Sequence, residues 1–299
     1  MSSTSRSAAL GVVIPAFNAE AKLPAAVESA LALGVSPENV IVVDDGSSDR
    51  TAEVASTLGC TVVSQLNAGA ASARRAGVLA TSLPYVILLD ADDTLEVAGI
   101  DESFALAERS DEWAAVMGGT LASPSEHGHH VAMNPWPEGV SVETLLRRGF
   151  SPGPPAAFLW RTAVLHDMYA SSHPLLAPAY AEDYEMLIRG AKAGLILTHT
   201  TPACRYALVG GKSARAPLAD NRAAEVIRVH YAHQYGVALT PRRDSELRSM
   251  AHFRTAYSKT GWAGAPGRAL HYLLAAVADP RFVSGLFLRK IRRSFARHS

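Results

Sequence analysis

Three carboxylates, Asp90, Asp92 and Asp93, occur within four positions of the chain. They follow the apolar run Val86–Leu89, which is typical of a strand buried on both faces. Carboxylates at the carboxyl end of a parallel strand lie where open α/β sheets bind their ligands. Because an Asp-x-Asp pattern supplies oxygen ligands for a hard divalent cation, this stretch predicts a metal site shared with phosphate groups. A solvated acidic turn is the simpler alternative for so short a motif.

Two other polar loops follow apolar strands in the first third of the chain. The run Leu10–Pro15 leads into Ala16–Asn18, and the run Val40–Val43 leads into the acidic segment Asp44–Asp49. Since the carboxyl ends of parallel strands line one edge of a sheet, we expect these loops and Asp90–Asp93 to form one site. Such a site suits a nucleotide held by its base, its ribose and, through a metal, its phosphates. The glycine fingerprint of dinucleotide-binding folds and the P-loop are both missing from the sequence.

Apolar strands alternate with helical segments up to Asp93, which indicates βαβ units. We therefore predict an α/β fold with a mostly parallel central sheet flanked by helices. After Asp93 the alternation loosens, and from about Asp220 the pattern is helical. Strands are expected near 10–15, 40–43, 61–64, 86–90, 113–121, 156–160 and 195–200. Helices are expected over 20–33, from about 51, after the loop 67–77, and over 94–108, 141–148 and 180–193, with a surface loop at 123–137.

The composition limits the classes of function. The chain has 299 residues, 48% of them hydrophobic, and a formal net charge of zero, so nothing indicates a nucleic-acid partner. Cys60 and Cys204 are too few and too far apart for a disulfide framework, which favours a reducing compartment. Residues 1–9 lack the apolar core of a signal peptide and are expected to be a disordered lead-in. No apolar run approaches the roughly 18 residues that span a bilayer, so we expect a cytoplasmic protein.

Five segments resemble the motifs of the family 2 glycosyltransferases, in that family's order and at its spacing. They are Val-Val-Ile-Pro-Ala-Phe-Asn-Ala-Glu at 12–20, Val-Asp-Asp-Gly-Ser-Ser-Asp-Arg-Thr at 43–51, Asn-x-Gly-x-x-x-Ala-Arg at 67–74, Leu-Asp-Ala-Asp-Asp at 89–93 and Ala-Glu-Asp-Tyr-Glu at 181–185. The resemblance covers roughly residues 10–215. It implies a glycosyltransferase A-type fold with Rossmann-like nucleotide binding, a nucleotide-diphosphate sugar donor, a divalent cation, Mn or Mg, and inversion at the anomeric carbon.

The resemblance also implies roles for individual residues on the donor side. Asp45 should accept the imide N–H of uracil, with Asp44 structural or assisting. Arg74 should lie near the base or the phosphates. Asp92 should ligate the cation, and Asp90 should face the ribose or the cation. The donor site implied in this way contains Pro15, Phe17, Asn18, Asp45, Asn67, Arg74, Asp90, Ala91 and Glu182.

Asp183 is the residue that the resemblance implies as the general base, with Glu182 beside it. It lies near the start of the predicted helix 180–193. The positive end of that helix should keep the carboxylate ionised at neutral pH, ready to take the proton of an acceptor hydroxyl. An acid that only complements the helix dipole is the alternative.

Two departures from the family pattern carry their own expectations. Arg75 replaces a frequent Asn and is expected to be solvated. Arg205–Ala207 stands where the family often has Arg-x-His, so a metal ligand from this segment is not assured. The following stretch, Gly210–Ser213, is either a loop that closes on the diphosphate through Lys212 or a mobile surface loop.

Two clusters outside these motifs are weaker candidates. His127, His129 and His130 lie in the predicted surface loop, but without a nearby cysteine their spacing is weak for zinc. The acceptor side is expected to use this loop and residues 151–160, where aromatic rings could stack on sugars. The rings are Trp136, Phe150, Phe158 and Trp160, of which Phe158 and Trp160 are expected to pack in the core instead.

Residues 10–218 are expected to form the catalytic domain, with a nucleotide-sugar-binding half at 10–95 and an acceptor half at 96–218. A helical extension at 219–299 should follow. Its tail, 281–299, has apolar residues spaced for one helical face and six basic residues without an acid. Such a tail suits either peripheral contact with an anionic membrane at its inner face or packing on the domain.

The sequence therefore predicts an inverting glycosyltransferase that moves a sugar from a nucleotide-diphosphate sugar, with uridine the favoured nucleotide, to an acceptor hydroxyl. The acceptor is expected to be a carbohydrate, a lipid-linked group or a small molecule, in the synthesis of cell-surface polysaccharide, glycolipid or secondary-metabolite glycosides. Two alternatives stay open. A sugar nucleotidyltransferase of similar fold usually carries a glycine-rich, lysine-containing loop after the first strand, which Pro15–Asn18 lacks. A nucleotide-sugar-binding protein without turnover would not need Asp183.

Overall fold

The computed structural model describes residues 9–109, 112–123, 131–171, 176, 179–207, 212–258 and 265–284 of the chain. Several features predicted from the sequence lie outside these residues. They are the lead-in 1–8, the histidines His127, His129 and His130, the loop 208–211 with the side chains of Lys212 and Ser213, and the tail from 285 onward.

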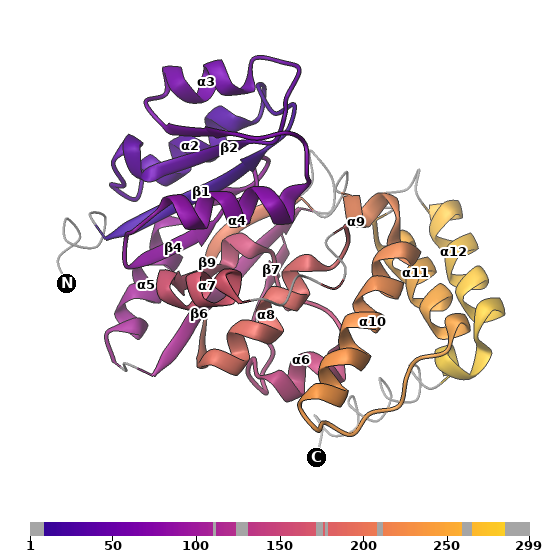
Figure 1. Cartoon of the computed structure of the whole chain (residues 1–299). Coiled ribbons are helices and arrows are strands. Elements are labelled where there is room, and N and C mark those ends of the chain that lie inside the picture. The colour runs from indigo at the N-terminus through magenta and orange to yellow at the C-terminus, as the bar shows by residue number, and fades with distance from the viewer. Residues whose placement is uncertain are drawn as a thin grey trace.

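The first half of the chain builds parallel strands, as predicted. They are β1 (Leu10–Ala16), β2 (Val40–Asp44), β3 (Thr61–Ser64) and β4 (Tyr85–Leu88), in the order β3-β2-β1-β4. The connecting helices are α2 (Leu23–Leu31), α3 (Thr51–Thr57) and α4 (Ala70–Ala80). Strands β1 and β2 are buried almost throughout because helices pack against this part of the sheet (Figure 1).

Helix α4 lies very close to the sheet. Gly77 makes this possible, since a Cβ at this position would lie 2.3 Å from Cγ1 of Val13 on β1. Arg74 lies one turn earlier on α4 and is buried. The close approach of the helix therefore holds a guanidinium at the carboxyl edge of the parallel strands.

The second half extends the same sheet with strands of both directions. Strand β8 (Phe158–Arg161) pairs antiparallel with β4 and with β6 (Trp113–Ser123), and β9 (Leu195–Ala207) runs parallel to β6. The order is β3-β2-β1-β4-β8-β6-β9-β5, with β5 at Thr94–Leu95 and β7 (Val131–Met133) paired with β6. The helices are α5 (Val97–Ala107), α6 (Val142–Arg148), α7 (Thr162–Ala170) and α8 (Glu182–Ala193). The predicted fold class, a mostly parallel sheet flanked by helices, is confirmed.

Some elements differ from the expectation. Part of the predicted surface loop forms β7, and α7 was not predicted, because it follows β8 without a loop or a side-chain cap to mark its start. Strand β9 continues well past Thr200. Pro202, which cannot donate to the ladder, lies opposite Gly119 where the register between β6 and β9 shifts. A proline is tolerated at such an irregularity, so the strand runs on to Ala207.

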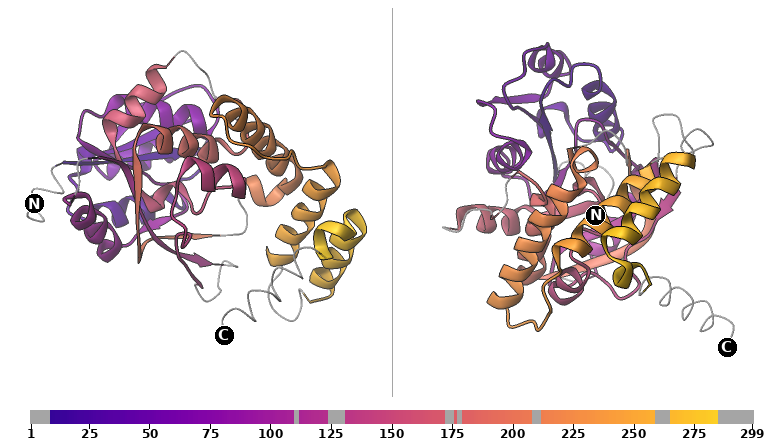
Figure 2. Two further views of the ribbon diagram at one scale, coloured as in Figure 1. Left: turned by 90° about the horizontal axis from the view of Figure 1, so that it is seen from below. Right: turned by 90° about the vertical axis from the view of Figure 1, so that its right-hand side faces the viewer.

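The rest of the described chain is helical. Its helices are α9 (Lys212–Arg215), α10 (Pro217–Gln234), α11 (Asp244–Ser258) and α12 (Ala265–Ala278). Helix α10 packs on α6 and α8, and α11 and α12 lie side by side beyond it (Figures 1 and 2). Within the described parts of the chain, no helix has the length and apolarity needed to cross a membrane.

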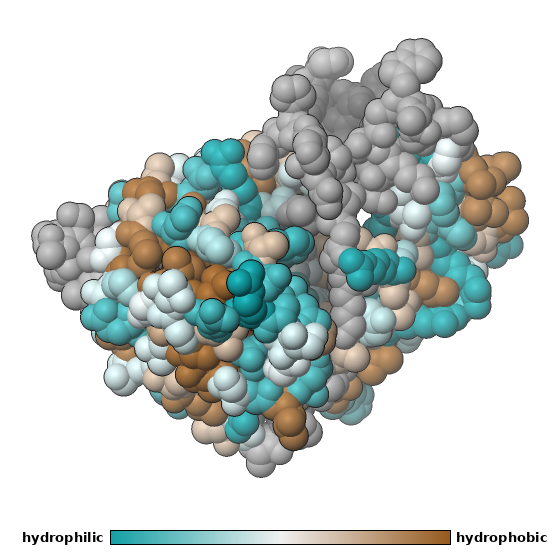
Figure 3. Space-filling view, turned by 90° about the horizontal axis from the view of Figure 1, so that it is seen from above, coloured by the Kyte–Doolittle hydropathy of each residue, from teal (hydrophilic) through white to brown (hydrophobic). Residues whose placement is uncertain are grey.

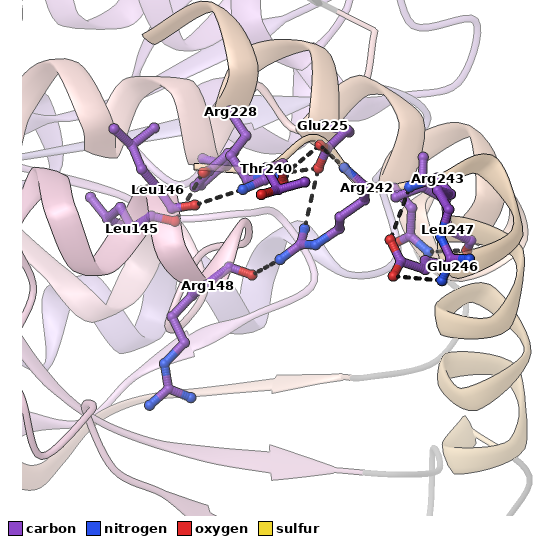
Figure 4. A network of polar contacts seen from close by, with 12 residues as sticks. Leu145, Leu146, Arg148, Glu225, Arg228, Thr240, Arg242, Arg243, Glu246 and Leu247 are labelled. Atoms are coloured by element: carbon purple, nitrogen blue, oxygen red, sulfur yellow. Dashed lines mark hydrogen bonds and ion pairs between the residues drawn. The ribbon is translucent and has the colours of Figure 1, made fainter. Parts of the chain in front are cut away.

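A buried ionic network joins α10 to the end of α6 (Figure 4). Arg228 donates from Nε and Nη2 to Glu225 at 2.7 and 2.6 Å. The backbone N–H of Arg242 donates to Glu225 at 2.8 Å, and Nη2 of Arg242 donates to the carbonyl of Arg148 at 2.6 Å. Because a buried charge without a partner is strongly destabilising, these contacts fix α10 and the segment after it on the end of α6.

A second buried carboxylate, Glu185 of α8, also contacts α10. Tyr231 donates its hydroxyl to Oε1 of Glu185 at 2.8 Å, and Arg189 Nη2 donates to the same oxygen at 3.0 Å. The backbone N–H of Leu176 donates to Oε2 at 2.8 Å. Glu185 lies two residues after Asp183, so α10 helps to hold the helix that carries the predicted base.

Candidate active site

The loops after β1 and β2 are joined by hydrogen bonds at the carboxyl edge of the sheet. The backbone N–H of Asn18 donates to Ser47 Oγ at 2.9 Å, and Asn18 Oδ1 accepts from the backbone N–H of Ser48 at 2.8 Å. Asp44 Oδ1 accepts from the N–H of Ser47 at 3.1 Å. Asn18 thus has a structural part, and Asp44 stabilises the turn, which agrees with the structural alternative expected for it.

Asp45 is buried and holds the loop that leads into α4. Its Oδ1 accepts from Gln65 Nε2 at 2.6 Å and from the N–H of Ala68 at 2.8 Å, and its Oδ2 accepts from the N–H of Gly69 at 2.8 Å. A carboxylate has about four lone-pair positions, so one position on Oδ2 is left for a ligand. Reading of the base by Asp45 stays a prediction that this geometry permits.

Arg74 connects the two halves of the site. Its Nη2 lies 2.6 Å from Asp90 Oδ1, and its Nη1 lies 2.9 Å from Glu182 Oε1. The guanidinium is always charged and has a planar set of donors, so it can hold both carboxylates at once. Arg74, which was expected near the base or the phosphates, therefore lies between Asp90 after β4 and Glu182 at the start of α8.

Asp183 faces the same space from α8. Burial raises the pKa of Asp183 to about 7, and repulsion by Glu182 adds to the shift, while Arg74 and the backbone N–H of Tyr184 oppose it. The expectation that the positive helix end keeps this carboxylate ionised at neutral pH is therefore wrong. Loss of solvent and a like charge outweigh the helix dipole, and the group is poised to gain or release a proton near pH 7.

Left-handed backbone conformations flank the site. Among the described residues, those other than glycine with a positive φ are Asn18, at 48°, and Ala181, at 57°. Ala181 directly precedes α8 and sets the direction in which Glu182 and Asp183 enter the helix. Such conformations are unfavourable for residues with a Cβ and are retained mostly where a site needs them.

A cavity of about 600 Å³ brings the predicted residues together. Asn67 is the exception, because it is exposed and does not line the cavity. The sequence missed Lys22 and Tyr180, which also line the cavity; Lys22 lies just before α2, where the loop after β1 ends. The predicted residues in the lining are Pro15, Phe17, Asn18, Asp45, Arg74, Asp90, Ala91, Asp92, Glu182 and Asp183.

The lining carries more negative than positive charge, with five carboxylates against Arg74 and Lys22. Nζ of Lys22 lies 3.3 Å from Oδ2 of Asp92. In the described residues, no group of three or more His, Cys, Asp or Glu side chains is arranged to hold a metal. Mg and related cations are commonly bound by one or two carboxylates plus substrate phosphates, and Asp92 with Asp90 fits that kind of site.

Side chains outside the cavity clarify other expectations. Arg75 is exposed, as expected. Arg205, which matches the Arg of the family's Arg-x-His, ion-pairs with Glu96. Phe158 and Trp160 are buried in the core, as expected, whereas Trp136 and Phe150 form an edge-to-face pair at 5.5 Å between ring centroids, with Phe150 exposed.

The chain resembles known proteins both in sequence and in fold. The family model described as Glycosyl transferase family 2 matches residues 11–143. An uncharacterized glycosyltransferase of Mycobacterium tuberculosis (strain H37Rv) is 39% identical over 97 residues, which is 32% of this chain and 43% of that protein. The uncharacterized glycosyltransferase YibD of Escherichia coli (strain K12) is 29% identical over 126 residues, 38% of this chain and 36% of that protein. The chain thus spans less than half the length of these relatives.

Solved structures with low sequence identity share the fold. TarS of S. aureus in complex with UDP has a TM-score of 0.56 at 17% identity, over 93% of this chain and 82% of that chain. Glucosyl-3-phosphoglycerate synthase of Mycobacterium tuberculosis, in complex with Mn²⁺, UDP and phosphoglyceric acid, has a TM-score of 0.55 at 19% identity, over 80% and 83% of the two chains. Residues 11–143 therefore belong to glycosyl transferase family 2, on a chain that has the glycosyltransferase A-type fold.

Proposed function

We propose that this protein is an inverting, metal-dependent glycosyltransferase that moves a sugar from a uridine-diphosphate sugar to an acceptor hydroxyl. The observation that carries the proposal is the shared cavity of Asp45, Asp92 and Asp183, which come from three distant parts of the chain. TarS has been solved with UDP and with UDP-GlcNAc, which supports a uridine donor for a chain of this fold.

The donor base and ribose belong, in this proposal, between the loop after β1 and Asp45. Pro15, Phe17 and Asn18 line that side of the cavity. The free lone-pair position on Oδ2 of Asp45 accepts the imide N–H of uracil. Since the rest of this carboxylate already holds the loop before α4, its position is fixed before the donor arrives.

The diphosphate belongs near Asp92. A nucleotide diphosphate is itself an anion, and the carboxylates of the lining outnumber the cations, so the donor needs added positive charge. Asp92 and Asp90 would hold a divalent cation, Mn or Mg, which would supply this charge and assist departure of the diphosphate. Lys22 lies beside Asp92 and contributes a second positive charge on the same side.

Asp183 acts as the general base on the acceptor side. The acceptor hydroxyl gives its proton to a carboxylate oxygen of Asp183 as the acceptor oxygen bonds to the anomeric carbon. The bond from that carbon to the diphosphate oxygen breaks on the opposite face, which inverts the centre. A pKa of about 7 places roughly half of the groups in the basic form at neutral pH.

A thermal-shift panel of nucleotide sugars, with Mn²⁺ and with a chelator, tests the proposal. A ligand that binds only the folded protein raises its melting temperature. We expect a uridine-diphosphate sugar to give the largest shift, and only with the metal. Transfer or slow donor hydrolysis should then follow with the same nucleotide sugar. The proposal fails if no nucleotide sugar stabilises the protein or if the donor binds without any turnover.

A further inference from the structure

Helix α12 presents an apolar face to solvent. Four of its large apolar residues are exposed: the exposed fraction is 54% for Leu270, 46% for Tyr272, 62% for Leu273 and 70% for Val277. Leu270, Leu273 and Val277 lie within about 60° of one another around the helix and form one apolar face, whereas Tyr272 lies toward α11, where its ring packs against Phe253. Figure 3 shows hydrophobic side chains gathered at the end of the molecule that α12 forms. Scattered apolar residues are normal on a surface, but a contiguous face of this kind marks an interaction site.

The orientation of this face is fixed by contacts on the other side of α12. Ser249 Oγ of α11 donates to the carbonyl of Ala275 at 2.9 Å, and Ala275 is fully buried. Asp279 is buried at the end of α12, where Ser245 Oγ donates to it at 2.7 Å and Arg243 Nη2 lies 3.0 Å away. Rotating the helix to hide its apolar face would break these buried polar contacts.

The segment that carries the face, residues 265–284, has no exposed acidic residue. Asp279 is the single acidic residue between 265 and 284, and it is the buried one. Arg268 precedes the face and Arg281 follows it. In a symmetric dimer the same face meets itself, so a second copy would bring these basic residues together and be repelled.

We propose that the outer face of α12 lies on an anionic lipid bilayer, with its apolar side chains in the headgroup region and the basic residues at the lipid phosphates. Apolar burial and attraction to anionic lipid are the two contributions that hold an interfacial helix. This surface is separate from the cavity, so the proposal does not depend on the donor or the acceptor.

Sedimentation with vesicles tests this proposal on the full chain. The protein is mixed with phosphatidylcholine vesicles or with vesicles that also contain phosphatidylglycerol, at low and high salt. The test variant is the pair Leu273→Glu and Val277→Glu. The matched control is the pair Leu79→Glu and Val226→Glu, which places the same added charge on exposed apolar positions of α4 and α10. A milder pair, Leu273→Ser and Val277→Ser, is the second variant in case the charged pair does not fold.

We expect the parent protein to bind the anionic vesicles and to release them at high salt. The α12 variants should bind about tenfold more weakly, while the control pair stays within about twofold of the parent. Equal loss in the test and control pairs would overturn the proposal, because charge alone would then explain binding. A parent that binds no vesicles would overturn it too. A parent dimer that the α12 variants convert to monomers would show that a second copy covers this face.

Discussion

Nη1 of Arg74 lies 2.9 Å from Oε1 of Glu182, although the two residues are 108 positions apart. The other end of the same guanidinium holds Asp90 at 2.6 Å. One buried cation therefore joins the segment after β4 to the start of α8, the helix that carries Asp183. Its removal affects both halves of the site at once.

Arg74→Ala should destabilise the protein by about 2–4 kcal/mol, because it removes a buried guanidinium and leaves two partly exposed carboxylates without their positive partner. Arg74→Lys should recover only part of this loss, since an ammonium cannot hold two carboxylates in the geometry of a planar guanidinium. Urea unfolding followed by circular dichroism measures both changes. Arg75→Ala is the matched control on an exposed neighbour and should lie within about 0.5 kcal/mol of the parent. Equal stability of Arg74→Ala and the control would contradict this reading.

Asp183→Asn should lower transfer by roughly 10²–10⁴, the usual worth of a positioned base, while donor and metal affinity stay within a few-fold. The change keeps the shape of the side chain and removes its basicity. Glu182→Gln should reduce transfer less. Initial rates and calorimetric titration with the donor separate the two effects. If Glu182→Gln is inactive and Asp183→Asn is normal, the base is the neighbour.

The raised pKa of Asp183 also predicts a pH-dependent stability. In the folded protein this group binds its proton more tightly than in the unfolded chain, so its stabilising contribution is complete below its ordinary pKa and is lost as pH rises through about 7. Asp183→Asn, which imitates the neutral form, should therefore stabilise the protein at pH 8 by about 1–2 kcal/mol, a figure that allows for partial solvent access. At pH 4 the variant and the parent should unfold at nearly the same denaturant concentration. A variant less stable than the parent at pH 8 would contradict the assignment.

Asp92→Ala should abolish the Mn-dependent part of donor binding, because this carboxylate is the exposed oxygen ligand beside the expected diphosphate position. Lys22→Met removes the ammonium that lies 3.3 Å from Asp92 but leaves the ligand in place. Mn-dependent binding should persist in that variant. Calorimetric titration of the donor with and without Mn²⁺ measures both. Full Mn-dependent binding by Asp92→Ala would place the cation elsewhere.

Asp45→Ala should weaken UDP binding by about 1–3 kcal/mol, the usual result of leaving a polar partner unpaired. The same change also releases the loop before α4. Gln65→Ala is the control, since it removes one hydrogen bond to Asp45 and leaves the carboxylate available. If both variants bind UDP equally weakly, the loop rather than base recognition explains the loss.

The sequence predicted which loops meet at the edge of the sheet better than it predicted the second half of the fold. Strand-end loops such as the one containing Asp92 could be placed because parallel strands end at one edge of a sheet. The antiparallel direction of β8 could not, because an apolar run has no direction in its pattern. The protonation state of Asp183 could not be predicted either. It depends on burial, on Glu182 and on Arg74, and only the fold brings Arg74 near. Lys22 was missed because a lysine at the start of a surface helix is usually solvated, and nothing in the sequence distinguishes Lys22 from such a residue.

The hydrogen bond from Tyr231 to Glu185 has a consequence for how such chains can diversify. Glu185 is fully buried and belongs to the same helix as Asp183, yet its partner lies beyond the predicted domain boundary at 218. A gene fusion or recombination event that exchanged the segment after residue 218 would remove this hydroxyl and leave a buried carboxylate short of a donor. Working hybrids with related enzymes should therefore join after α10, with Tyr231 and Glu185 inherited together.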